Sequence, residues 1–264
     1  EHLLRLRPRG AGRYLRAVRP PPLPHQTGLL APIIERVAGH AAESGRAPVV
    51  VFDLDATLYD NRPRTLEILM EYREEVLETQ PEIADKLGEL TAERVQYLLS
   101  DTLRTCGITR SEVVADVTRY WHERFFNDAY LKHDAPLEGA PDFVRACHEA
   151  GGIVVYLTGR DVSGMLSGTV SSLCDSGFPF AIAGIELILK PDASLPDEAF
   201  KRGALPTLDR LGDVVAFFDN EPANCNLAKA MFPDASVVAL ETQKVPYAPE
   251  LADDVAVVAD FRLI

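Results

Sequence analysis

Hydrophobic residues follow two different spacing patterns along this chain, and the first pattern predicts an α/β core. Short runs without a polar residue, such as Val49–Phe52 and Val214–Phe218, are typical of strands buried on both faces of a parallel sheet. Between such runs, apolar residues recur at spacings of three and four, which indicates helices. Strands that alternate with helices predict right-handed crossovers and a Rossmann-like three-layer α/β/α fold around a parallel sheet.

The elements expected in this core can be placed by residue number. The helices are expected at residues 29–42, 141–150, 162–176, 196–211 and 222–231. The strands are expected at residues 48–54, 153–157, 214–218 and 236–240, with a strand or loop at 181–189 and an edge strand at 255–259. Open sheets of this kind place their sites at the carboxyl ends of the strands.

The second spacing pattern covers residues 62–132, where helical spacing persists and no strand pattern occurs. One helix is expected over residues 95–103, and Thr109 with Glu112 fits a capping box that would open the last helix. We therefore expect an all-α domain of three or four helices inserted after the first strand. The expected division is an N-terminal extension and leading helix at 1–47, an α/β core at 48–61 and 133–264, and the helical insertion at 62–132.

Charge sets the first 46 residues apart from the rest. The chain has a net charge of −13, and residues 1–46 carry eight arginines against three acids, or +5, which leaves −13 − 5 = −18 for the remainder. An acidic body disfavours nucleic-acid binding, so no nucleic-acid partner is expected. The basic start could contact a membrane surface or an acidic partner, but the three prolines at 20–22 favour a solvated tail.

The cysteines and the apolar runs indicate a cytoplasmic protein. The four cysteines are scattered without a C-x-x-C pair, which argues against a zinc cluster or a disulfide framework and fits a reducing compartment. The apolar runs are too short to cross a bilayer, and no signal-peptide core is visible. We expect a cytoplasmic location and no transmembrane segment, while the oligomeric state stays open.

Four polar features follow predicted strands or open a helix. Asp53 and Asp55 come directly after the first strand, and two carboxylates beside a buried strand are costly unless a cation or a reaction uses them. Thr158 ends the second core strand, Lys201 lies near a helix start, and Asp219 ends a later strand.

In this order, these residues resemble the motifs of the haloacid dehalogenase-like hydrolase superfamily. Asp53-Leu-Asp55-Ala-Thr57 is similar to its first motif, Thr158 to its second, Lys201 to its third and Asp219 to its fourth. The resemblance covers about residues 48–240, and it implies that the helical insertion is a mobile cap. Lys190 is a rival for the third motif, but we prefer Lys201 because its helix leads straight into the Asp219 strand.

The resemblance also implies roles. Asp53 would be the nucleophile, and Asp55 would protonate the leaving oxygen and then activate water. Thr158 and Lys201 would hold the transferring phosphoryl group, with Gly159 and Arg160 as further substrate-binding candidates. For Arg160, a structural ion pair is the alternative. Mg²⁺ would be held by Asp53, the Asp55 carbonyl and Asp219. The commoner second aspartate of the fourth motif is missing, so Glu221 or Asn224 would fill the outer shell.

The expected function is therefore a magnesium-dependent phosphatase that hydrolyses a small phosphomonoester through an aspartyl-phosphate. The presence of Asp55 counts against a dehalogenase, which lacks this second aspartate. A phosphomutase or phosphotransferase would share every motif, and a catalytically quiet phosphate-binding regulatory module is the alternative from another class. Substrate choice is expected to lie in the insertion, where no motif names a ligand.

Overall fold

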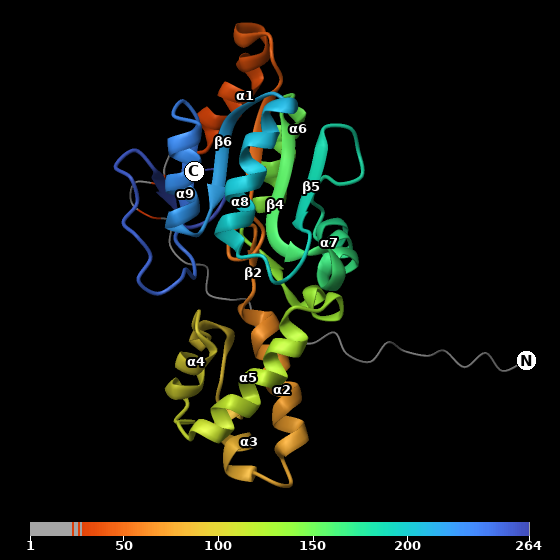
Figure 1. The fold of residues 1–264 in the computed structure, drawn as a ribbon, viewed down its shortest axis with the longest axis vertical. Coiled ribbons are helices and arrows are strands. Elements are labelled where there is room, and N and C mark those ends of the chain that lie inside the picture. The colour runs from red at the N-terminus through yellow and green to blue at the C-terminus, as the bar shows by residue number, and fades with distance from the viewer. Residues whose placement is uncertain (1–22, 24–25, 27, 264) are drawn as a thin grey trace, which may run out of the picture.

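The computed structural model describes residues 23, 26 and 28–263 of the chain (Figure 1). The arginine-rich start, and with it the predicted tail, lies outside these described residues. Within them, no helix combines the length and apolar character needed to span a bilayer.

A six-stranded parallel sheet forms the centre of the core, in the order β5-β4-β1-β6-β7-β8. The strands are β1 (Pro48–Phe52), β4 (Ile153–Asp161), β5 (Ile185–Lys190), β6 (Asp213–Asp219), β7 (Ser236–Leu240) and β8 (Ala256–Val258). Every neighbouring pair in the sheet is parallel. All five residues of β1 are buried, as its continuous apolar sequence predicts for a central strand.

Helices cover both faces of this sheet, which confirms the predicted three-layer α/β/α fold (Figure 1). One face packs against α1 (Ala31–Ser44), α6 (Ala140–Glu149) and α7 (Val162–Asp175) through a shared apolar cluster. The other face packs against α8 (Asp197–Ala204), the 3₁₀ helix η3 (Leu205–Arg210) and α9 (Pro222–Met231). The helix predicted at 196–211 is thus α8 continued by η3.

The chain between β1 and β4 contains the helical insertion, which extends away from the sheet (Figure 1). Its helices are α2 (Arg62–Val76), α3 (Pro81–Gly88), η1 (Ala92–Arg94), α4 (Leu99–Thr105), α5 (Ser111–Phe125) and η2 (Asp128–His133). They enclose an apolar cluster of their own, separate from the two that flank the sheet. The chain leaves and returns through two short antiparallel strands, β2 (Tyr59–Asp60) and β3 (Ala135–Pro136).

Two local predictions for the insertion are wrong. Residues 95–98 are not helical: Val95 and Leu98 are extended, and the helix begins only at Leu99. The capping box does not form either, because α5 begins at Ser111 after Arg110, and no side chain caps its first turn. The helices expected in both places do form, as α4 and α5, but the sequence patterns do not fix the residue at which each helix begins.

Candidate active site

The candidate site lies where three neighbouring strands end. Strand β1 lies between β4 and β6, and Phe52 of β1 pairs with Phe218 of β6. Asp53 directly follows β1 and donates its backbone N–H to the carbonyl oxygen of Phe218 at 3.0 Å. Because the strands are parallel, the polar residues at their carboxyl ends share one edge of the sheet. These residues are Asp53, Thr158 and Asp219.

Lys201 joins the two aspartates of this edge. Its Nζ lies 2.7 Å from Oδ1 of Asp53 and 2.6 Å from Oδ2 of Asp219, and all three side chains are buried. Lys190 instead forms an ion pair with Asp197 at 2.7 Å. The structure therefore brings Lys201, and not Lys190, to the aspartates.

This triad carries more negative than positive charge. Burial raises the pKa of Asp53 to about 7; Lys201 opposes that rise, and the nearby charges of Asp219 and Asp55 add to it. Burial alone would lower the pKa of Lys201, but the two carboxylates that it contacts outweigh burial and raise it. Two carboxylates that share one ammonium group favour the binding of either a proton or a further cation.

Asp219 is fixed by groups that follow it in the sequence. Its Oδ1 accepts the backbone N–H of Glu221 at 2.8 Å, and Nδ2 of Asn224 lies 3.2 Å from both carboxylate oxygens. The carboxylate of Glu221 points elsewhere and accepts the backbone N–H of Val245. Of the two residues proposed for the outer shell, Asn224 therefore contacts Asp219 with its side chain.

Asp55 is held by two arginines rather than by the triad. Arg160 donates from Nε and Nη2 to its two oxygens, both at 2.9 Å, and Nη2 of Arg64 lies 2.6 Å from Oδ1. Nδ2 of Asn61 adds a bond of 2.7 Å to the same oxygen. Burial alone would raise the pKa of Asp55, but Arg160 and Arg64 outweigh burial and hold it well below its usual range.

The second motif lies at an irregular point of β4. Thr158 pairs with β5, but pairing resumes only at Asp161, so Gly159 and Arg160 bulge from the ladder. The Thr158 hydroxyl is buried and accepts the backbone N–H of Arg160 at 3.2 Å. At Gly159, a Cβ would lie 2.5 Å from a carboxylate oxygen of Asp197, so only glycine fits without a shift of that side chain.

The oxygen atoms of the triad suit a hard cation. Among the described residues, no group of three or more His, Cys, Asp and Glu side chains is placed to hold a metal ion. The predicted ligand set needs only two such side chains, those of Asp53 and Asp219, together with the Asp55 carbonyl. Oδ1 of Asp53 binds Lys201, while Oδ2 has no hydrogen bond to a described residue. Carboxylate and carbonyl oxygens are the ligands that Mg²⁺ prefers.

Sequence reasoning missed two residues of this region, Arg64 and Asp134. Arg64 and Asp134 form a fully buried ion pair of 2.8 Å. A signal for Arg64 was present in the sequence, because it shares a helical face with Ile68 and Tyr72, which are buried. An arginine on the apolar face of a helix requires a buried partner.

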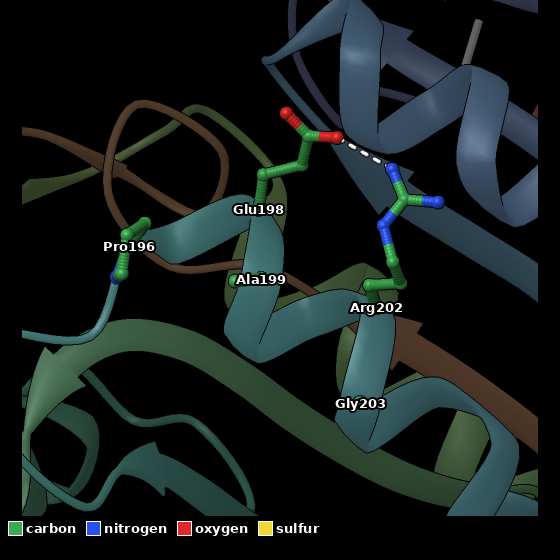
Figure 2. A pocket seen from close by; sticks show the side chains of 5 residues that line it. All are labelled: Pro196, Glu198, Ala199, Arg202 and Gly203. Atoms are coloured by element: carbon green, nitrogen blue, oxygen red, sulfur yellow. Dashed lines mark hydrogen bonds and ion pairs between the residues drawn. The ribbon is translucent and has the colours of Figure 1, made fainter.

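The open hollow shown in Figure 2 is not this site. Its lining residues lie on or next to the outer face of α8, where Arg202 and Glu198 form an exposed ion pair of 2.6 Å. Lys201 is buried on the inner face of the same helix. The hollow therefore contains none of the predicted site residues.

Comparison with known proteins gives a likeness in structure only. No family model matches the sequence, and no curated protein matches it. Among solved structures, CbbY from Rhodobacter sphaeroides in complex with phosphate is 16% identical with a TM-score of 0.44, over 81% of this chain and 94% of that one. A dehalogenase with an intermediate complex is 17% identical with a TM-score of 0.45, over 81% and 93%. A hydrolase from Streptococcus pneumoniae TIGR4 is 14% identical with a TM-score of 0.42, over 74% and 90%. At these values the matches assign no function to the chain.

Proposed function

We propose that this chain is a phosphatase of the haloacid dehalogenase-like superfamily that acts on a small phosphomonoester. The observation that carries the proposal is the buried Asp53–Lys201–Asp219 triad, in which a lysine binds two aspartates from adjacent strand ends. Asp55, two residues after Asp53, supplies a second carboxylate that is one-third exposed. The dehalogenases of the superfamily lack this second aspartate.

In the proposed first step, Oδ2 of Asp53 attacks phosphorus while the bond from phosphorus to the leaving oxygen breaks. Lys201 binds Oδ1 of Asp53, which leaves Oδ2 as the nucleophilic atom. Lys201, the Thr158 hydroxyl and the backbone around Gly159 stabilise the charge on the transferring group. A proton from Asp55 neutralises the leaving oxygen, and this requires its ion pairs with the arginines to loosen.

In the proposed second step, a water molecule attacks phosphorus and restores Asp53. Asp55 takes the proton of this water and therefore has to be ionised, which is the form that Arg64 and Arg160 favour. Asp53, the Asp55 carbonyl and Asp219 would hold Mg²⁺, which supplies positive charge to the phosphoryl oxygens. The helical insertion would act as a cap that excludes water, and the scattered cysteines favour a cytoplasmic location.

The first test is hydrolysis of a generic aryl phosphate by purified protein, with and without Mg²⁺. We expect turnover only with Mg²⁺, and we expect Asp53→Asn to lower kcat by at least about 10³-fold because the nucleophile is lost. Asp142→Asn changes an exposed aspartate of α6 and serves as the matched control with an unchanged rate. Equal rates for wild type and Asp53→Asn would contradict the assigned nucleophile.

Product analysis separates the phosphatase from its two alternatives. With a sugar phosphate as substrate, a phosphatase releases inorganic phosphate, whereas a phosphomutase returns an isomeric sugar phosphate. A quiet binding module would give neither product with any member of a panel of phosphorylated metabolites.

A further inference from the structure

Four charged side chains form a closed cluster beside the triad. Arg64 and Arg160 each bind both Asp55 and Asp134, with N–O distances between 2.6 and 2.9 Å. Two arginines and two aspartates make the cluster neutral. We refer to these four residues as the arginine–aspartate cluster.

Every nitrogen of the two guanidinium groups already has a hydrogen-bond partner within the protein. Besides the aspartates, Arg64 donates from Nη1 to the carbonyl oxygen of Phe125 at 2.8 Å, and Arg160 donates from Nη1 to the hydroxyl of Thr169 at 3.4 Å. The side chains of Arg64 and Arg160 are 0% and 1% exposed, whereas that of Asp55 is 33% exposed. Asp55 is therefore the member of the cluster that faces solvent, and the others lie behind it.

Stability alone does not account for this arrangement. A buried ion cluster is often no more stable than apolar side chains of similar volume, because the desolvation of each charge offsets the attraction. The cluster does supply orientation. The forked contact of Arg160 fixes the plane of the Asp55 carboxylate, and Arg64 with Asn61 fixes one oxygen within that plane.

The cluster also links Asp55 to the helical insertion. Arg64 lies in the first turn of α2, and Asp134 lies directly after η2, where the chain returns from the insertion. Arg160 belongs to β4 of the core. Both connections of the insertion therefore meet the core at the back of the Asp55 carboxylate.

We propose that Arg64 and Arg160 are positioning residues that act through Asp55, with Asp134 as their buried anchor; this proposal rests on the proposed function. The arginines orient the ionised Asp55 carboxylate toward the attacking water, and they do not contact the substrate. This replaces the substrate-binding role that the sequence suggested for Arg160.

The test is a double-mutant cycle on kcat with the aryl phosphate and Mg²⁺. Arg64→Lys and Arg160→Lys keep the charge but lose the fork, and we expect each to lower kcat by about 10- to 100-fold with little change in KM. Asp55→Asn alone should lower kcat by about 10²- to 10⁴-fold. In the Asp55→Asn background, each lysine substitution should change kcat by less than about 2-fold, because its effect passes through the missing carboxylate.

A second variant and a second measurement guard against a failure to fold. Asp134→Asn keeps the size of the side chain and leaves Asp55 in place, and we expect a smaller loss of kcat that also disappears in the Asp55→Asn background. Circular dichroism and thermal unfolding identify variants that do not fold. Among folded variants, effects that multiply with that of Asp55→Asn would overturn the inference while leaving the proposed function intact. If wild type showed no more turnover than Asp53→Asn, the proposed function would fail, and the inference with it.

Discussion

At the scale of single residues, the surroundings of Asp53 disfavour its ionised form. Its pKa is raised to about 7, chiefly because the side chain is buried, and the lysine beside it is already shared with Asp219. A raised pKa in the folded state means that the protonated form of Asp53 favours folding. That contribution is fully present below the ordinary pKa near 4 and is lost as the pH rises through 7.

The pH dependence of stability tests this state without any substrate. In metal-free buffer at pH 8, we expect Asp53→Asn to raise the free energy of unfolding by about 1–4 kcal/mol, since each pKa unit corresponds to about 1.4 kcal/mol. Near pH 4 the two proteins should be equally stable. Urea unfolding at both pH values measures the difference, and the exposed Asp142→Asn is the control. A variant less stable than wild type at pH 8 would show that the Lys201 contact outweighs burial.

The residues of the triad could be predicted from the sequence because they lie next to elements with clear patterns. Asp53 and Asp219 each end an apolar run, so their place at the edge of the sheet follows from the strands themselves. For the lysine, the sequence offered both Lys201 and Lys190, and the packing of α8 decides between them. The contact of Asp134 with Arg64 joins residues 70 positions apart, and no periodicity indicates a pairing of that kind.

At the scale of elements, the predicted helices and strands of the core agree well with the structure, and the differences occur where tertiary contacts override spacing. Residues 95–98 are not helical, and other groups satisfy part of their backbone. The hydroxyl of Thr102 accepts the N–H of Gln96 at 2.8 Å, and Gln243 donates to the carbonyl oxygen of Val95 at 2.7 Å. Strands β2 and β3 have two residues each, which is too short for any pattern.

The packing of α7 on η2 depends on a glycine. A Cβ at Gly168 would lie 2.8 Å from Cα of Asp128, too close for any side chain, and the Gly168 N–H donates to the Asp128 carboxylate at 2.5 Å. We expect Gly168→Ala to lower the free energy of unfolding by about 1–3 kcal/mol, because η2 has to move away. Chemical denaturation measures this change.

Gly203 of α8 provides the matched control. It is also helical, but a Cβ there would meet no atom within 4 Å. Gly203→Ala should therefore stabilise the protein by about 0.4–1 kcal/mol, since alanine loses less conformational entropy on folding. Equal effects at the two glycines would contradict the close contact between α7 and η2.

At the scale of the whole molecule, the loop after β7 connects the candidate site with the helical insertion. Asn220, next to Asp219, donates to the carbonyl oxygen of Gln243 at 2.6 Å, and the side chain of Thr242 bonds the carbonyl oxygen of Ala56 in the first motif. Gln243 itself reaches Val95 of the insertion. This loop therefore contacts both aspartate motifs and the insertion.

Removal of that contact should loosen the insertion without unfolding the core. We expect Gln243→Ala to lower the free energy of unfolding by about 0.5–1.5 kcal/mol, because one hydrogen bond is lost. Amide hydrogen exchange should become faster at residues 92–98 and stay unchanged in β1 and β6. Lys244→Ala, at the adjacent position, is the control with no change at 92–98. Unchanged exchange in Gln243→Ala would mean that the insertion is held by its other contacts.

The paired strands at the base of the insertion also bear on how such proteins can diversify. Tyr59 of β2 lies opposite Pro136 of β3, so the chain departs from the core and rejoins it at neighbouring points. The insertion has its own apolar cluster, and the sheet has two others. A recombination event that exchanged the segment between these two strands would attach a different helical domain to the same sheet. The new segment would keep the contacts of Asp55 only if it carried an arginine and an aspartate equivalent to Arg64 and Asp134.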